Sequence, residues 1–164
     1  IEALKFLPEN VKFKILGVGP LENNLKLKIR NLKLEGRVRF MGFVDHKKIP
    51  DFLHQADIFI RPSVSEGMGN SFIEAMAAGL PVIATNVGGI PDFIIDPDAS
   101  PNKAPTGLFV EVKNPQDIAK KVEKLIKNNK LRESMVTNAK RLVRERYDWD
   151  LIAEQMKSKV LSNI

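Results

Sequence analysis

Two glutamates flank a glycine-rich loop in the middle of this sequence, and together they form a candidate anion-binding site. Glu66 opens the run EGMGNS, in which Gly67 and Gly69 let the backbone approach a ligand closely. The helix expected to begin near Asn70 presents unpaired N–H groups and the positive end of its dipole to this loop, which suits a phosphate or diphosphate. The loop alone fits equally well a tight turn in which Asn70 caps the helix.

The second glutamate, Glu74, stands on an otherwise apolar helix. It is the only charged residue between Gly67 and Pro81. Burying a carboxylate without a partner is costly, so this side chain needs either a ligand or a buried ion pair. A vicinal diol such as that of a ribose offers two donors to one carboxylate, and Glu66 could reach the other end of the same ligand. The alternative is a purely structural salt bridge.

Apart from these two glutamates, the sequence contains few side chains of the types that commonly carry catalysis. Cysteine is absent, which excludes disulfides, thiolate nucleophiles and Cys-ligated zinc. The two histidines, His46 and His54, lie in a predicted helix without a third ligand type nearby, so we expect both at the surface and no metal site. No residue stands out as a general base.

The elements that must position these residues alternate between short apolar runs and helical periodicity. Strands are expected at 12–19, 38–43, 57–62, 81–85 and 107–110, and helices at 21–33, after Asp45, at 70–79, after the N-cap Asn114, at 130–146 and after Asp148. This alternation predicts an α/β fold, a Rossmann-like parallel sheet with helices on both faces. Ligands of such sheets bind beyond the carboxyl ends of the strands, which here carry loops 17–20, 42–45 and 62–71.

Composition and charge narrow the class of protein. The 164 residues are 43% hydrophobic and 28% charged, which is typical of one folded domain, and no apolar run approaches the roughly 18 residues of a membrane span. The net charge of +6 is divided into +4 over residues 1–60, −3 over 61–110 and +5 over 111–164. The excess lies on lysine-rich helices with few aromatics, which favours a solvated surface over a nucleic-acid interface.

A long segment of the sequence resembles a known family. The run PSVSEGMGNSFIEAMAAGLPVIATNVGGIPDFI (62–94) is similar to the signature of the group 1 (family 4) glycosyltransferases, which have the two-domain GT-B fold. Glu66 and Glu74 stand in that family's E-x7-E spacing. Further matches are GVGP (17–20), RVRFMGFV (37–44), ADIFIRPS (56–63) and YDWD (147–150).

The resemblance implies a domain organisation. Residues 1–164 correspond to the C-terminal, donor-binding domain, without its first strand and without the N-terminal acceptor domain. The chain is therefore interpreted as a piece of a longer protein and is expected to be inactive alone. The family's basic residues that neutralise the diphosphate would lie upstream of it.

The resemblance also implies site residues. Glu66, the candidate catalytic residue, would contact the sugar or the diphosphate, and Glu74 would hold the donor ribose hydroxyls. The remaining donor-binding residues act through their backbone and are Gly17, Gly19, Phe43, Val44, Gly67, Met68, Gly69, Asn70 and Ser71. Of these, residues 67–71 would cradle the sugar and phosphates, residues 43–44 would read the base edge, and the glycines at 17 and 19 would leave room beside the base.

The implied activity is that of a retaining glycosyltransferase of glycan or polysaccharide biosynthesis. It would move a hexose-type sugar from a UDP-, GDP- or ADP-linked donor to a glycan, lipid or small-molecule acceptor. We expect no cofactor and no metal. The expected partners are the nucleotide-sugar and the protein's own N-terminal domain, with no nucleic acid and with membrane contact only through regions outside this chain. The expected location is the cytoplasm, including the inner face of the membrane.

Some features depart from the family pattern or favour other functions. Met68 replaces the commoner Phe, Asp92 replaces Glu, and loop 96–106 is longer than usual, which affects the expected sugar selectivity. A dinucleotide-dependent oxidoreductase is disfavoured because Glu22 replaces the third glycine of G-x-G-x-x-G in GVGPLE. A non-enzymatic nucleic-acid-binding or structural α/β module is the alternative function.

The last expected helix carries an apolar stripe of Trp149, Ile152, Met156 and Val160. In the family this helix packs on the N-terminal domain. Without that domain we expect it to fold back onto its own domain, to fray, or to dock against a second copy of the chain.

Overall fold

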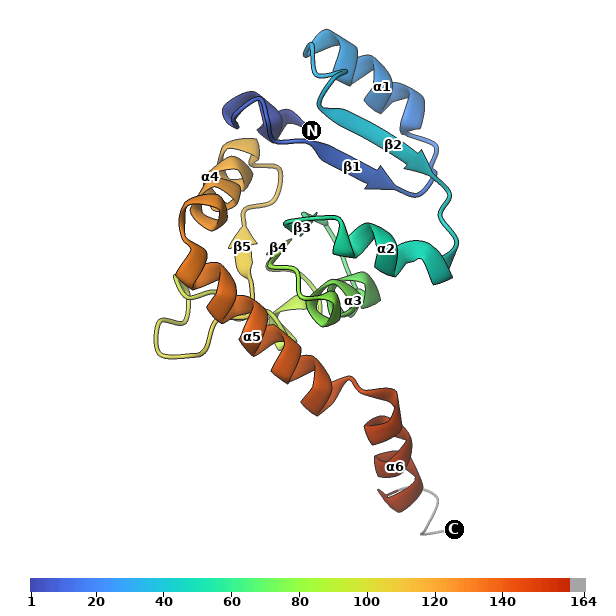
Figure 1. Cartoon of the computed structure of the whole chain (residues 1–164), viewed down its shortest axis with the longest axis vertical. Helices are drawn as coiled ribbons and strands as arrows, with labels where there is room; N and C mark the ends of the chain where they lie inside the picture. Colours follow the sequence, from blue (N-terminus) through green and yellow to red (C-terminus); the bar gives the residue numbers. More distant parts are fainter. Residues whose placement is uncertain (160–164) are drawn as a thin grey trace.

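The computed structural model describes residues 1–159 as five short strands with helices around them (Figure 1). The strands are β1 (Phe13–Leu16), β2 (Val38–Gly42), β3 (Phe59–Arg61), β4 (Val82–Thr85) and β5 (Leu108–Val110). The α-helices are α1 (Glu22–Asn31), α2 (Ile49–His54), α3 (Asn70–Ala78), α4 (Pro115–Lys127), α5 (Asn129–Arg146) and α6 (Trp149–Lys159). Three 3-10 helices are η1 (Glu2–Phe6), η2 (His46–Lys48) and η3 (Ile90–Asp92). Each strand lies within its predicted range, and the α/β class is confirmed.

The strands form two parallel sheets instead of the single sheet that the sequence predicts. One sheet pairs β1 with β2, and the other has the order β3-β4-β5. Within the described residues no backbone ladder joins β1 to β3, which is why the sheet is divided. In Figure 1, β1 lies on the side of β2 that faces β3.

Strand β4 is the centre of the hydrophobic core because both of its faces are buried. Alternate residues of a strand point to opposite faces of the sheet. Ile83 joins a cluster that includes Leu108 of β5 and Leu125 of α4, whereas Val82 and Ala84 join a second cluster that includes residues of α3 and α5. Such two-sided burial is the pattern expected of a parallel strand covered by helices.

Local chemistry sets the helix boundaries much as the sequence predicts. Asn114 caps α4 by accepting a hydrogen bond from the backbone N–H of Asp117 at 3.0 Å. Gly79 ends α3 in the left-handed conformation, with φ at 86°. Among the described helices, none is both long and apolar enough to cross a membrane.

Helix α6 extends away from the rest of the domain (Figure 1). Asp148 caps it by accepting hydrogen bonds from Asp150 N and Leu151 N at 2.9 and 3.3 Å. Trp149 is 79% exposed and Met156 is 58% exposed. Of the three outcomes predicted for this helix, folding back onto its own domain is therefore wrong. Val160 lies outside the described residues.

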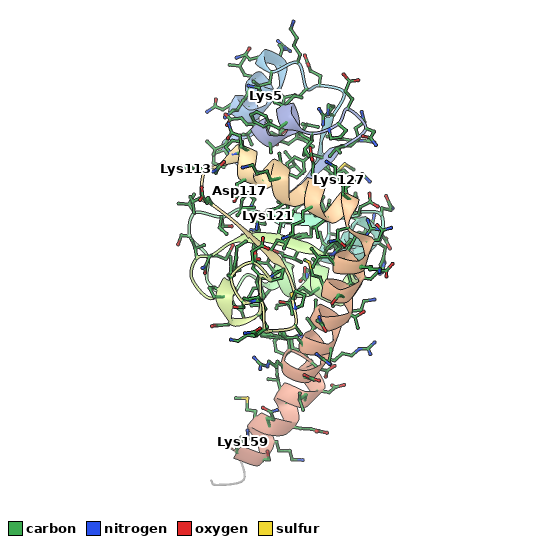
Figure 2. All side chains as sticks on the ribbon, turned by 90° about the vertical axis from the view of Figure 1, so that its left-hand side faces the viewer. Lys5, Lys113, Asp117, Lys121, Lys127 and Lys159 are labelled. Atoms are coloured by element: carbon green, nitrogen blue, oxygen red, sulfur yellow. The ribbon has the colours of Figure 1, made fainter. Side chains whose placement is uncertain are left out.

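Loop 96–106 is held to α4 by a cluster of charges. Buried Asp96 accepts a hydrogen bond from Asp98 N at 2.7 Å and another from Phe109 N. Asp98 pairs with Lys121 at 2.8 Å and with Lys124 at 2.6 Å, and Figure 2 shows Lys121 on α4. Hydrogen bonds from Lys121 and Lys124 hold the pKa of Asp98 below its ordinary value. Burial lowers the pKa of Lys121, but the hydrogen bond that Lys121 donates to Asp98 and the charge of Asp96 outweigh it, so that this pKa is raised.

This cluster predicts an acid-sensitive contribution to stability. A carboxylate whose pKa is depressed on folding stabilises the native state above its unfolded pKa of about 4, and this contribution is lost as the pH falls through the folded pKa. We expect Asp98→Asn to lower the free energy of unfolding at pH 7 by up to about 1 kcal/mol, because more than half of this side chain is exposed. Below pH 4 the difference from wild type should shrink.

Urea unfolding between pH 2.5 and pH 7 measures this effect. Asp57→Asn, in the exposed bend before β3, is the matched control and should change stability little at any pH. A deficit of Asp98→Asn that is equally large at pH 2.5 and pH 7 would contradict the assignment.

Candidate functional site

Loops 17–20, 42–45 and 62–71 follow β1, β2 and β3, as predicted, and specific contacts connect them. The N–H of Gly17 donates to the carbonyl of Gly42 at 2.8 Å, which joins the first loop to the second. His46, just after the second loop, is bonded to Glu74 of α3. Helices α2 and α3 lie side by side (Figure 1). The structure therefore gathers the three loops along one rim, although they belong to two sheets.

The third loop enters α3 through a turn that only glycine adopts easily. Gly69 is the N-cap residue, with φ at 69° and ψ at 70°, and it provides no side-chain cap. Asn70 is the first residue of the helix, so the alternative in which Asn70 caps α3 is wrong. No side chain caps the first N–H groups of α3; that of Phe72 donates to the carbonyl of Gly69 at 2.9 Å, and the positive end of the helix dipole lies at this start. Phe72, fully buried, anchors this first turn in the core.

A second backbone segment supports the glycine-rich loop from behind. The N–H of Gly89 donates to the carbonyl of Gly67 at 3.1 Å. Gly88 has φ at 56°, and a Cβ there would lie 1.8 Å from the carbonyl oxygen of Glu66. A Cβ on Gly67 would meet nothing within 4 Å. The loop is thus packed tightly on the side of Gly88 and open on the side of Gly67.

Glu66 is held by two side chains that the sequence analysis did not single out. Its Oε2 forms an ion pair with Arg61 Nη2 at 2.9 Å and accepts a hydrogen bond from Ser63 Oγ at 3.2 Å. The exposed fraction of the Glu66 side chain is only 14%, so these donors replace most of its water. Within the described part of the chain, Oε1 accepts no hydrogen bond.

Glu74 also has one oxygen occupied within the protein. Its Oε1 is 3.1 Å from Nε2 of His46, and the exposed fraction of its side chain is 36%. The expected burial of this carboxylate is therefore wrong, because this side of α3 lies at the rim. His46 is exposed, as predicted, but it also supplies the polar partner that the sequence analysis required for Glu74.

The other predicted site residues are exposed, apart from the half-buried Val44, Gly69 and Ser71. Phe43 is 78% exposed and Met68 is 48% exposed. A Cβ on Gly17 or Gly19 would meet nothing within 4 Å, so there is space beside both. Ser71 accepts a hydrogen bond from Arg61 Nη1 at 2.8 Å.

Sequence reasoning missed Arg61, Ser63 and the pairing of His46. One signal was available, because Arg61 is one of only two basic residues in the acidic stretch 61–110. Among residues 1–159 the structure brings together no group of three or more metal-ligating side chains.

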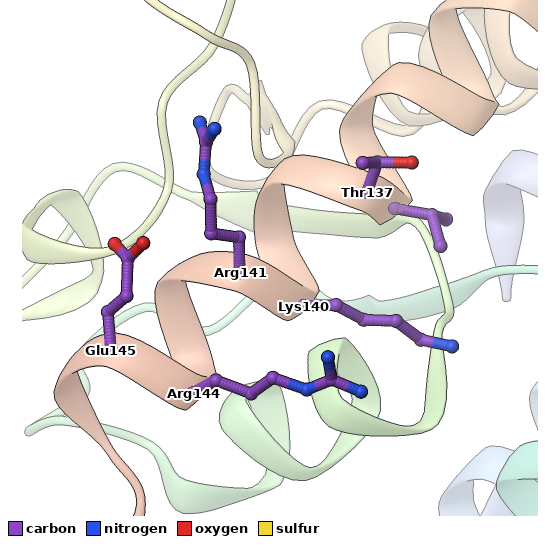
Figure 3. A pocket seen from close by; sticks show the side chains of 6 residues that line it. Thr137, Lys140, Arg141, Arg144 and Glu145 are labelled. Carbon is purple, nitrogen blue, oxygen red and sulfur yellow. The ribbon is translucent and has the colours of Figure 1, made fainter.

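A hollow of about 590 Å³ lies elsewhere, along the exposed face of α5 (Figure 3). Its charged lining includes Lys140, Arg141 and Arg144. All of its lining residues belong to α5, so no second element closes over a ligand there. None of the predicted site residues contributes to it.

Comparison with known proteins supports the same family. The sequence model of "Glycosyl transferases group 1" matches residues 1–142. An uncharacterized glycosyltransferase of Methanocaldococcus jannaschii is 36% identical over 146 residues, which cover 89% of this chain and 36% of that protein. The N-acetyl-alpha-D-glucosaminyl L-malate synthase of Bacillus anthracis is 32% identical over 146 residues, with the same two coverages of 89% and 36%. The chain thus spans about a third of the length of these relatives.

Solved structures extend the match to the whole fold. The crystal structure of Anabaena HepE in complex with UDP superposes with a TM-score of 0.86 at 25% identity, covering 99% of this chain and 44% of that one. The complex of the same protein with UDP-glucose gives the same TM-score, identity and coverage. These neighbours confirm that the α/β architecture is that of the GT-B glycosyltransferases.

The packing around the loop predicts that alanine substitution changes stability by different amounts at two glycines on facing segments. We expect Gly88→Ala to lower the free energy of unfolding by about 2 kcal/mol or more, because its Cβ collides with a carbonyl oxygen at a positive φ. Gly67→Ala should change stability by less than about 1 kcal/mol, because its Cβ points into open space. Urea denaturation of both variants measures the difference, and equal destabilisation would show that the loop is not packed as described.

Proposed function

This chain belongs to the group 1 glycosyl transferases, and on that premise we propose that it is the donor-binding domain of such an enzyme, the part that holds a nucleotide-sugar. The observation that carries the proposal is the state of the two glutamates. Glu66 and Glu74 each have one carboxylate oxygen bound within the protein and the other without a donor among the described residues. They flank the uncapped start of α3. Hydroxyl groups and phosphates complement this arrangement of acceptors and N–H groups.

The nucleoside would lie between Glu74 and the loops that follow β1 and β2. The second oxygen of Glu74 would accept from the ribose hydroxyls. The main chain at exposed Phe43 and half-buried Val44 would read the base edge, in the space beside Gly17 and Gly19. HepE is solved with UDP and with UDP-glucose, which supports UDP among the three candidate nucleotides.

The diphosphate and the sugar would lie against the glycine-rich loop. Backbone N–H groups of residues 67–71 would face the diphosphate, and Oε1 of Glu66 would accept from a sugar hydroxyl. As the glycosidic bond breaks, negative charge develops on the leaving nucleoside diphosphate. Prepositioned N–H groups at the start of α3 stabilise that charge without having to reorient. We propose a hexose-type donor and transfer with retention, as the family resemblance implies.

The domain assignment is part of this proposal. The relatives are about three times as long as the matched segment, which agrees with an acceptor-binding domain elsewhere in the whole protein. The acceptor would be a glycan, a lipid or a small molecule. The open edges of β1 and β3 support one further strand between them, since parallel sheets are seldom as small as two strands.

Nucleotide binding by the 164-residue chain tests the proposal. Isothermal titration calorimetry with UDP, GDP, ADP and UDP-glucose should show saturable binding that prefers one base. Duplex DNA, titrated at rising salt, is the comparison ligand for the alternative of a nucleic-acid-binding module. Steeply salt-dependent DNA binding without nucleotide binding would contradict the proposal.

Glu74→Gln tests the ribose contact. The substitution keeps the shape of the side chain but replaces a charged acceptor by a neutral one, so we expect a loss of roughly 1–3 kcal/mol in nucleotide affinity. Stability should change little. Glu123→Gln on α4 is the matched control, because Glu123 has the same exposed fraction of 36% and also pairs with one neighbour, Lys127. Wild-type affinity in Glu74→Gln would show that Glu74 has only a structural role.

A further inference from the structure

We infer that Arg61 is a positioning residue for the sugar end of the site: it fixes the carboxylate of Glu66 so that Oε1 faces the donor sugar. The inference rests on the proposed function and adds to it a residue that neither the sequence analysis nor the family resemblance assigns. Arg61 would hold the side chain of Glu66, which lies on a glycine-rich loop, in one orientation.

The guanidinium of Arg61 connects three parts of the site. Its Nη2 forms an ion pair with Oε2 of Glu66 at 2.9 Å, and its Nη1 donates a hydrogen bond to Oγ of Ser71 at 2.8 Å. The guanidinium carbon lies 5.8 Å from the ring centroid of Phe72, within the range of a cation–π contact. One side chain therefore binds both the residue that opens the loop and the first turn of α3.

The backbone of Arg61 is fixed in the sheet, whereas the carboxylate of Glu66 lies at the end of a side chain on a loop. Arg61 is the last residue of β3 and is paired with Ala84 of the central strand β4. The backbone of Glu66 is packed against Gly88 through its carbonyl, so the direction of its carboxylate depends on the side chains around it. An ion pair and a hydrogen bond from one planar guanidinium fix direction as well as charge.

The two carboxylate oxygens of Glu66 differ in their contacts: Oε2 is bound within the protein, and Oε1 is left for a ligand. Oε2 is bound by Arg61 and Ser63, and within the described residues Oε1 has no donor. Without Arg61 the carboxylate can rotate, and its negative charge has no cation within ion-pair distance among the described residues. The sugar would then lose an oriented acceptor, while the nucleoside, bound at Glu74, would lose nothing.

The alternative role for Arg61 is a direct phosphate ligand. Its side chain is 47% exposed, so it is accessible to a ligand. The two roles differ in what they predict for UDP, which has the phosphates but no sugar. A direct phosphate contact makes UDP itself bind more weakly, whereas positioning of Glu66 affects only the part of the affinity that the sugar contributes.

The test measures dissociation constants for UDP and for UDP-glucose on five forms of the 164-residue chain. These are wild type, Arg61→Met, Arg61→Lys, Glu66→Gln and the double variant Arg61→Met with Glu66→Gln. Arg144→Met, which removes an arginine from the exposed face of α5 (Figure 3), is the matched control. Urea unfolding of each form shows how much of any loss comes from stability.

The expected result concerns the ratio of the Kd for UDP to the Kd for UDP-glucose. Arg61→Met and Glu66→Gln should each lower this ratio about tenfold, and the double variant should lower it no further, because both changes remove the same interaction. Arg61→Lys should fall in between, since lysine keeps the charge but cannot span Glu66 and Ser71. The Kd for UDP should stay within twofold in every form, and Arg144→Met should match wild type.

Three outcomes would overturn the inference. If Arg61→Met leaves the ratio unchanged while Glu66→Gln lowers it, Glu66 does not depend on Arg61. If Arg61→Met weakens UDP as much as UDP-glucose, Arg61 is a phosphate ligand. If wild type binds neither ligand, the proposed function itself fails, and the inference fails with it. This third outcome is distinguishable from the first two because it is seen with wild type alone.

Discussion

The close backbone approach between residues 66–67 and residues 88–89 is the constraint on which the candidate site depends. A Cβ on Gly88 would lie 1.8 Å from a carbonyl of the loop, so only glycine allows the two segments to pack this way. That packing places Glu66 at the edge of the core, and the left-handed turn at Gly69 then directs the chain into α3. Because Phe72 is buried in the core, the first N–H groups of α3 are held at the rim. Loop, helix start and both glutamates follow from this one contact.

Each glutamate of the site has one side-chain partner or more within the chain before any ligand binds. Arg61 compensates Glu66, and His46 provides a polar partner to Glu74, while each glutamate keeps one oxygen for another donor. Leaving a carboxylate of this kind unpaired costs more than pairing it, and a fully paired carboxylate could not accept from a ligand. The contact between His46 and Glu74 also connects the loop after β2 to α3, so the two sheets contribute to one surface.

Much of the fold and of the site could be predicted from the sequence, because those features are encoded locally. Apolar runs gave all five strands, Asn114 and Gly79 gave their helix ends, and the E-x7-E spacing gave the two glutamates. What could not be predicted depends on contacts between distant segments. Arg61 and Ser71, or His46 and Glu74, meet only after β3, α2 and α3 have packed. The exposed position of Glu74 depends on which side of α3 reaches the rim, and the division of the strands into two sheets depends on pairing that no local pattern encodes.

The central claim is that the rim at the start of α3 is the donor site, and amide chemical-shift mapping by ¹⁵N NMR tests it most directly. On titration with UDP-glucose, the account predicts the largest shift changes at the N–H groups of residues 67–71, with smaller ones at residues 43–44. The basic hollow on α5 should be unaffected, although Lys140, Arg141 and Arg144 could attract a diphosphate by charge alone. Saturable changes confined to α5, with none at residues 67–71, would contradict the account.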